Sequence, residues 1–298
     1  MDDTIRVFSG RAFCFEDINM IKWVIGTYPR LSVSELASTV CELLDWTNTS
    51  GGPKLDQCIT LLDQLESEDI IKLPPRVTRC KSKKTNAKIE FDTTKIVGDI
   101  RSFEPIHLAI ARPGKDLNKW RSYVDQYHML GFKKMFGSRL CYFIKSGDTD
   151  LGCIQFSASS WALADRDEWI EWDIEDRKQR LHLIINNSRY LIFPWVRIQN
   201  LASKGLSLAA KQIQEDWLHE FCYAPVLLET FVDREHYMGT SYKAANWLYL
   251  GQTKGRGRDS NSKIPNRSIK DIYVYPLQKN FKACLKGEAP YKAVNPDV

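Results

Sequence analysis

The chain has 298 residues, of which 43% are hydrophobic, 27% charged and 11% aromatic, and its net charge is +5. These values are ordinary for a globular protein and exclude wholesale disorder and fibrous or coiled-coil designs. No stretch approaches 18 consecutive apolar residues, and the acidic start MDDTIRVFSG lacks the basic and apolar regions of a signal peptide. We therefore expect one large domain or two modest ones, with no membrane partner.

The eight cysteines and five histidines are scattered along the chain. The sequence contains neither C-x-x-C nor H-x-x-x-H, and the cysteines mostly lie within apolar runs. This usage is typical of buried thiols in a reducing compartment and not of a disulfide framework or a zinc site. We expect a cytoplasmic protein without a dedicated metal site.

Charge is distributed unevenly. Residues 1–75 contain 6 Lys+Arg against 12 Asp+Glu, whereas residues 236–298 contain 11 against 4. A basic C-terminal quarter predicts a positive surface that attracts phosphate groups, although a solvated basic tail has the same composition.

The N-terminal segment, residues 1–75, is predicted to be a helical module. Apolar residues recur at helical spacing in EDINMIKWVI, in SVSELASTVCELLDW, which Ser32 and Glu35 begin with a capping-box spacing, and in PKLDQCITLLDQLESEDI. A short strand, IIKLPP, is expected to follow. This order resembles a winged helix-turn-helix, which binds DNA through its second helix. Because the module is acidic, docking onto a protein, or onto the C-terminal domain, is an equal alternative.

Residues 76–105 are basic, polar and weakly patterned, so we interpret them as a linker. From residue 106 to 298, predicted strands and helices alternate, which indicates a mixed-sheet α/β domain. The predicted strands are IHLAIA, RLCYFIK, LGCIQFSAS, SRYLIFPWVRI, VLLETFVD, WLYL and DIYVYPL. The predicted helices are DLNKWRSYVDQYHML, DRDEWIEWDIEDRKQRLHLII, LASKGLSLAAKQIQEDWLHEF and a short one at TSYKAAN.

Several long blocks of the chain resemble the DruA family. They are NNSRYLIFPWVRIQNLAS, YAPVLLETFVDREHYMGTSYKAANWLYLGQTKGRGR, KDIYVYPL and the LSVSELASTVCELLDW…GGPKLDQCITLLDQLE…IKLP region. That family is named for a component of the Druantia anti-phage defence system, and related domains occur beside transposases. The resemblance implies a role in defence together with other proteins of the system, but it implies no settled reaction.

The strand order resembles that of GNAT-type N-acyltransferases, by analogy only. Pro194 should interrupt a strand where those enzymes open their sheet for the cofactor's pantetheine arm. Asn200 and Ser203 begin a long helix whose amides could hold a pyrophosphate. However, the glycines with which acetyl-CoA users approach that group are missing except for Gly205. The sequence thus predicts a GNAT-like fold and leaves the cofactor unknown.

Glu229 is the sharpest catalytic candidate, because a carboxylate in mid-strand is costly to bury unless it is paired or used. An ion pair with Arg189 or Lys243 is the structural alternative. Further candidates are Asp233 on the same strand face, Tyr242 and Asn246 four residues apart on a short helix, and His128 as an acid or base. A metal-dependent nuclease would need Glu171, Asp173, Glu229 and Asp233 to converge.

The segment that follows Thr253, KGRGRDSNSKIPNRSIK, is the predicted nucleic-acid contact, with DNA as the expected ligand. Its glycines would allow the backbone to approach phosphates closely. The basic residues are Lys254, Arg256, Arg258, Lys263, Arg267 and Lys270. Two classes of function remain: a DNA-binding or DNA-sensing component of a defence system, and an enzyme, with acyl transfer ahead of a nuclease.

Overall fold

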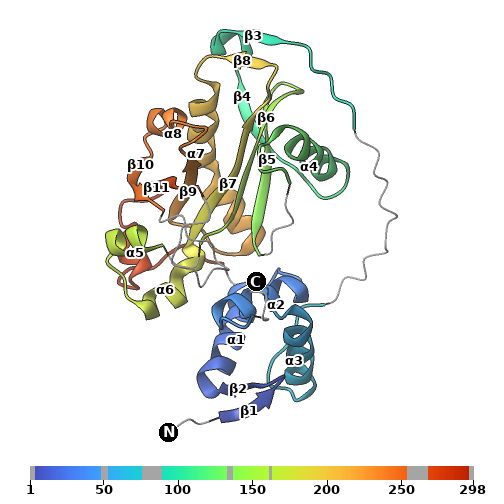
Figure 1. The fold of residues 1–298 in the computed structure, drawn as a ribbon, viewed down its shortest axis with the longest axis vertical. Helices are drawn as coiled ribbons and strands as arrows, with labels where there is room; N and C mark the ends of the chain where they lie inside the picture. The colour runs from blue at the N-terminus through green and yellow to red at the C-terminus, as the bar shows by residue number, and fades with distance from the viewer. Residues whose placement is uncertain are drawn as a thin grey trace.

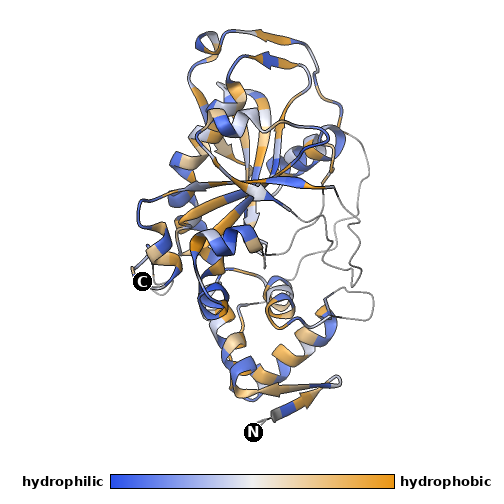
Figure 2. Cartoon of the chain, turned by 60° about the vertical axis from the view of Figure 1, so that its left-hand side comes forward, coloured by the Kyte–Doolittle hydropathy of each residue, from blue (hydrophilic) through white to orange (hydrophobic). Residues whose placement is uncertain are grey.

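The computed structural model describes residues 4–47, 53–75, 89–132, 137–160, 163–253 and 268–294. Two separate hydrophobic cores lie within these residues, one in an N-terminal module up to Leu73 and one in an α/β domain that begins near Phe91 (Figures 1 and 2). Among the described helices, none is long and apolar enough to cross a membrane.

The N-terminal module is a β-hairpin followed by three helices. Its elements are β1 (Thr4–Phe8), β2 (Arg11–Cys14), α1 (Phe15–Thr27), α2 (Val33–Leu43) and α3 (Leu55–Ser67). Helix α2 begins as predicted, since Glu35 Oε2 accepts hydrogen bonds from the backbone N–H of Ser32 at 3.1 Å and from its hydroxyl at 2.7 Å. No strand forms over residues 70–75, and the hairpin precedes the helices. The winged helix is therefore not confirmed.

The α/β domain is built on a seven-stranded sheet in the order β10-β11-β9-β7-β6-β5-β4. Its strands are β4 (Ile106–Ile110), β5 (Arg139–Ser146), β6 (Thr149–Ala158), β7 (Ile184–Ile192), β9 (Leu227–Asp233), β10 (Leu248–Gln252) and β11 (Lys270–Pro276). All neighbours are antiparallel except β7 and β9. The predicted mixed α/β class is confirmed, and β10 and β4 are the edge strands.

Helices cover both faces of this sheet. The helices are α4 (Lys115–Tyr127), α5 (Ala164–Ile170), α6 (Ile174–Arg180), α7 (Leu201–Phe221), α8 (Thr240–Ala244) and α9 (Phe281–Leu285), with short 3₁₀ turns η1 (Ile100–Phe103) and η2 (Leu181–Leu183). Successive residues of β5 point to opposite faces. The Tyr142 hydroxyl donates to Asp216 of α7 at 2.9 Å, whereas the Phe143 ring meets Tyr123 of α4 edge-on. Helices α4 and α7 therefore lie on opposite faces (Figure 1).

Pro194 ends β7 but does not open the sheet. After it, β8 (Val196–Ile198) leaves the main sheet and pairs in parallel with β3 (Ile96–Gly98). Phe91 stacks on Tyr123 with ring centroids 3.7 Å apart. Residues 89–105, expected to belong to a linker, thus pack on the α/β domain, while residues 76–88 lie outside the described part of the chain.

The sheet opens between β7 and β9 at another place. Their pairing covers only three residue pairs and ends at Asn186 and Glu229. Just beyond, the register of β7 against β6 shifts, so that Ser188 is the extra residue of a bulge. The bulge turns β7 away from β9, and this is where a gap forms.

The two cores meet through aromatic side chains below the sheet. Tyr28, which follows α1, and Trp23 lie edge-on to the His182 ring at centroid distances of 6.0 and 5.7 Å. Arg30 donates to the carbonyl of Glu220 at 3.2 Å, and Arg139 pairs with Glu35 at 3.6 Å. The module is therefore docked onto the α/β domain, with α1 and α2 nearest to it (Figure 1).

Candidate functional site

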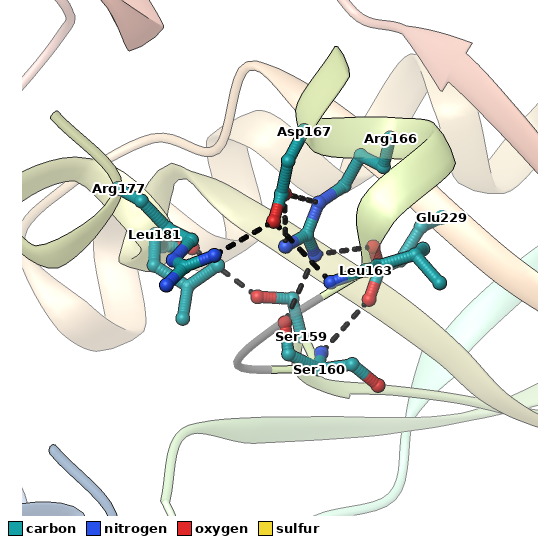
Figure 3. A network of polar contacts seen from close by, with 8 residues as sticks. All are labelled: Ser159, Ser160, Leu163, Arg166, Asp167, Arg177, Leu181 and Glu229. Carbon is teal, nitrogen blue, oxygen red and sulfur yellow. Dashed lines mark hydrogen bonds and ion pairs between the residues drawn. The ribbon is translucent and has the colours of Figure 1, made fainter. Parts of the chain in front are cut away.

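Glu229 lies at the point where β7 and β9 separate, and it is fully buried. Its Oε1 accepts a hydrogen bond from the backbone N–H of Ser160 at 2.9 Å, and its Oε2 accepts one from Arg166 Nη1 at 2.8 Å. Arg166 comes from α5 and reaches across to β9, as Figure 3 shows. The predicted ion pair with Arg189 or Lys243 is wrong, because Arg166 takes that place.

The Arg166 guanidinium is fully buried and joins Glu229 to a second carboxylate. Its Nε and Nη2 donate to Asp167 Oδ1 at 2.9 and 2.7 Å, and Arg177 of α6 donates to Asp167 Oδ2 at 2.9 Å. Burial alone would lower the pKa of Arg166, but the two carboxylates outweigh it and raise that pKa. Two cations and two anions therefore form a neutral chain that ties α5 and α6 to the sheet (Figure 3).

This geometry makes Glu229 a positioning residue. Both of its oxygens are hydrogen-bonded, and the side chain has no exposed surface that a substrate could reach. A buried carboxylate satisfied in this way holds neighbouring elements in place. The charge network provides the ion pair that the sequence analysis gave as the structural alternative, and a catalytic role for Glu229 stays a prediction.

The gap between β7 and β9 is filled by side chains of the chain itself. The Tyr242 hydroxyl donates to Asn187 Oδ1 at 2.7 Å, and its ring stacks on Tyr273 at a centroid distance of 5.8 Å. Burial raises the pKa of Tyr242 to about 12, so the phenol stays neutral and remains a donor. Next to it, the Tyr190 hydroxyl donates to the carbonyl of Ala202 in the first turn of α7.

Asn200, Ser203 and Gly205, where the sequence suggested a cofactor's pyrophosphate, make contacts within the chain. Asn200 caps α7 in the left-handed region with φ 63°, and its carbonyl accepts from the Ser203 hydroxyl at 3.1 Å. A Cβ at Gly205 would lie 3.1 Å from Tyr190 Oη, so this glycine serves helix packing within the protein.

Asn246 and His128, two further predicted catalytic residues, do not join Tyr242 in one site. Helix α8 ends at Ala244, and Asn246 follows it in the left-handed region, exposed, so the expected shared helical face does not form. His128 ends α4 on the other face of the sheet, where its Nδ1 accepts from the Leu130 N–H at 3.1 Å. Burial and the charge of Arg189 lower the pKa of His128 to about 4, so it is neutral at physiological pH.

Asp233 shares the strand face of Glu229 but lies four residues, about 13 Å, further along β9. Its oxygens accept from the Ser268 hydroxyl at 2.8 Å and the Glu235 N–H at 3.1 Å. Burial alone would raise the pKa of Asp233, yet these hydrogen bonds and nearby positive charges lower it. Among the described residues, Asp233, Glu235 and His236 could together ligate a cation, but two of them are exposed and nothing else marks a site.

The four carboxylates that a nuclease would need do not converge. Glu171 lies within 4.0 Å of Lys282 and Lys286, on the surface. Asp173 caps α6 by accepting from the Asp176 N–H at 2.7 Å. With Glu229 paired to Arg166, the four carboxylates do not form the cluster that the nuclease alternative would require.

The outer hairpin, which we define as β10 and β11, carries the ends of the basic segment. Thr253 and Lys270 are joined by two hydrogen bonds, from the Thr253 N–H to the Lys270 carbonyl at 2.9 Å and from the Lys270 N–H to Thr253 Oγ1 at 3.0 Å. Lys270 starts β11 opposite Asp233. The other predicted contacts, Lys254, Arg256, Arg258, Lys263 and Arg267, lie outside the described residues.

Exposed aromatic rings surround this hairpin. Tyr249 on β10 is 50% exposed, and Tyr237, in the turn after β9, is 56% exposed. Both β10 and the segment after β9 lie against Tyr273. The ring centroids of Tyr249 and Tyr273 are 5.6 Å apart, and a Cβ added at Gly239 would lie 2.5 Å from the Tyr273 hydroxyl oxygen. The sequence analysis did not predict these exposed rings, although the aromatic run WLYL shortly before the basic segment indicates them.

The sequence also missed Arg166, Asp167 and Arg177 as a unit. They occupy the run DRDEWIEWDIEDRKQR, whose charges are typical of a solvated helix. The run contains two short helices, broken at Glu171 in the left-handed region, and this break turns Arg177 toward Asp167. A left-handed residue of this kind has no reliable sequence signal unless it is glycine or asparagine.

The fold and these two regions define a protein with a helical N-terminal module docked on a mixed-sheet α/β domain, with a charge network at its centre and an outer hairpin that carries exposed aromatic rings. Comparison with known families assigns it more closely. Residues 64–264, about two thirds of the chain, match the family described as Druantia protein DruA, and the chain belongs to that family. No curated protein matches.

Solved structures with a similar arrangement are distant in sequence. One is FeeM, an N-acyl amino acid synthase from uncultured soil microbes, at 12% identity over 58% of this chain and 90% of that chain, with a TM-score of 0.37. Another is the aminoglycoside acetyltransferase AAC(6')-Ib with coenzyme A, at 10% identity over 57% and 94%, TM-score 0.36. The match to the microcin C7 self-immunity acetyltransferase MccE, at 10% identity and TM-score 0.28, covers 46% of this chain and 61% of that one. These structures are similar to this chain in fold only.

Proposed function

We propose that the protein is a nucleic-acid-binding component of a Druantia-type anti-phage defence system, and that it binds nucleic acid, with DNA as the expected form, at the outer hairpin. Other proteins of the system would be its partners. The observation that carries the proposal is the joining of a strongly basic segment to an exposed aromatic hairpin. Residues 254–267 contain five basic residues and one acidic residue, and the segment starts and ends at this hairpin.

The chemistry of the described residues supports a single-stranded ligand. Lys270 and Lys243 add positive charge near the hairpin, where Arg234 pairs with Asp271 at 3.4 Å, and Tyr237 and Tyr249 offer ring surfaces to solvent. Proteins that bind single strands combine phosphate-neutralising cations with aromatic rings on which bases stack. Acyl transfer, the alternative from sequence, stays a prediction, and the filled gap at Tyr242 gives it no support.

The proposal can be tested by substituting Tyr249, the exposed aromatic residue of β10. Binding of a fluorescently labelled single strand is measured by anisotropy for Tyr249→Ala and Tyr249→Phe. Stacking contributes about 1–3 kcal/mol per base, so the alanine variant should bind roughly 5- to 150-fold more weakly and the phenylalanine variant should keep its affinity. Equal binding by wild type and Tyr249→Ala would reject this surface as the contact.

A further inference from the structure

Arg189 is a buried cation without an anion. It lies on β7 just past the bulge at Ser188, and it is 9% exposed. Its Nε donates to the carbonyl of Gly131 at 3.0 Å, and its Nη1 donates to the carbonyl of Ser188 at 2.6 Å. Among the residues that the structure describes, no carboxylate oxygen lies within the 4.0 Å of an ion pair with Arg189. Asp125, whose Oδ1 would lie 3.4 Å from a Cβ at Gly131, is exposed and forms no such pair.

A comparison with Arg166 shows what Arg189 lacks. Both guanidinium groups are buried, but two carboxylates raise the pKa of Arg166, whereas burial alone acts on Arg189 and lowers its pKa. His128, at the end of α4, senses the charge of Arg189 and is itself neutral, so it supplies no negative charge. A buried charge is costly unless an opposite charge is present. An arginine kept in this state therefore points to an anion that the chain does not supply.

The Arg189 guanidinium keeps donors for such an anion. Its contacts with the two carbonyls use Nε and Nη1 and leave the N–H groups of Nη2. Nη2 donates to no group in the described part of the chain, and it is not among the fully buried polar atoms, so solvent reaches it. The two carbonyls belong to irregular backbone, one after α4 and one in the bulge, and they fix the plane of the guanidinium. Nη2 is therefore a fixed donor that is reached through a small exposed area.

Two polar side chains on the same sheet face also lack partners. Ser157 is fully buried and lies on β6 two residues from Gln155, the residue opposite Arg189, which is a distance of about 7 Å along the strand. Its neighbour on β7 is Asn186. Ser157 Oγ and Asn186 Oδ1 are both buried, and neither forms a hydrogen bond with a described residue. Because buried polar atoms nearly always have a partner, these oxygens are a second indication of a polar ligand, bound directly or through water.

We propose that Arg189 binds a carboxylate, which is either the acid group of a small molecule or the C-terminus of a peptide. A carboxylate carries one negative charge, which one guanidinium balances, and its two oxygens match the donors of an arginine. A phosphodiester also carries one charge, but sugars flank it on both sides, and a side chain as recessed as Arg189 admits only a terminal group. The site shares no residue with the outer hairpin and is independent of nucleic-acid binding there.

The experiment is an NMR titration of the ¹⁵N-labelled full chain with acetate, with acetyl-tetra-alanine, with the C-terminal amide of that peptide and with dimethyl phosphate. The Nε–H resonance of Arg189 is identified by its loss in Arg189→Gln, or in Arg189→Lys if circular dichroism shows that the glutamine variant does not fold. Backbone amide shifts give the affinity of each variant. Arg197→Gln, at an exposed position of β8, is the matched control.

We expect acetate and the free peptide to shift the Arg189 resonance saturably and the peptide amide to leave it unchanged. Loss of a charge-assisted hydrogen bond should make Arg189→Gln bind roughly 10- to 150-fold more weakly, while Arg197→Gln keeps the wild-type affinity. Equal affinity for acetate and peptide assigns a small acid as the source, and tighter binding of the peptide assigns a chain end.

Three results would overturn the proposal. The first is an Arg189 resonance that neither acetate nor the free peptide shifts at millimolar concentration. The second is equal affinity for acetate in wild type and Arg189→Gln. The third is tighter binding of dimethyl phosphate than of acetate, which would assign the site to a nucleic-acid backbone instead.

Discussion

Replacing Glu229 by glutamine should destabilise the protein and leave its ligand-binding surface intact. The glutamine amide would keep an oxygen as acceptor for the Ser160 N–H. Its NH₂ group would replace the carboxylate oxygen that accepts from Arg166 Nη1 at 2.8 Å in the wild type, so two donors would face each other. Removing one partner of a buried pair costs about 3–5 kcal/mol because the other charge is left buried. Arg166 still has Asp167, so we expect the lower end, about 3 kcal/mol, or roughly 6–12 °C in the melting temperature.

The assay is urea-induced unfolding followed by circular dichroism, with nucleic-acid binding measured in parallel. Glu175→Gln is the matched control, because Glu175 pairs with Lys178 at a similar 2.8 Å on the surface. Such a pair is worth less than about 1 kcal/mol, so the control should barely change the unfolding midpoint. The double variant Arg166→Met with Glu229→Leu should recover much of the loss. The reasoning is refuted if Glu229→Gln unfolds like wild type but no longer binds nucleic acid.

Two predictions concern the interface between the modules. His182 has a pKa of about 3 when buried and an ordinary value of 6.5 when exposed, so the open state takes up the proton first. The docked state is fully stable above pH 6.5 and loses stability as the pH falls toward 3, by about 2 kcal/mol at pH 5. Thermal unfolding across this pH range should show this loss of stability in wild type and a smaller loss in His182→Phe. Melting temperatures that fall equally with pH in the two proteins would contradict the argument that His182 is buried in its neutral form. Deleting residues 1–75 uncovers His182 and Tyr223, so the remainder should aggregate where the full chain is monodisperse in size-exclusion chromatography. A monodisperse remainder would show that the interface contributes little.

Much of the fold could be predicted from apolar periodicity. The helices α2, α4 and α7 and the strands β4 to β6 and β9 follow from their patterns, since local sequence determines which face is buried. The N-terminal hairpin was missed, although Ser9 and Gly10, with φ of 49° and 78°, form the tight turn that an S-G pair often indicates. Residues 89–105 were expected to belong to a linker because their few apolar residues show no period, yet Phe91, Ile96, Ile100 and Phe103 pack on the α/β core.

The site was harder to predict because its contacts are non-local. Glu229 was singled out correctly as a buried carboxylate, but its partner is 63 residues away in a helix that looks solvated. Pro194 was expected to open the sheet, whereas the bulge at Ser188 does so, and a bulge without glycine leaves little trace in a sequence. The contact at His182 could not be foreseen, since it exists only where two separately patterned modules meet.

We propose that nucleic acid is bound at the outer hairpin through the basic segment that joins its two strands. The direct measurement is binding affinity across a salt series for wild type and for Arg256→Ala with Arg258→Ala. Lys95→Ala with Arg101→Ala is the control, which removes the same charge from exposed positions near β3. Each phosphate contact contributes about 0.9 to the slope of log K against log salt on duplex DNA and about 0.7 on single strands. The account predicts that the arginine variant binds more weakly, with a slope flatter by about 1.8 or 1.4, and that the control keeps the wild-type slope. An arginine variant that matches wild type in both affinity and slope would contradict it.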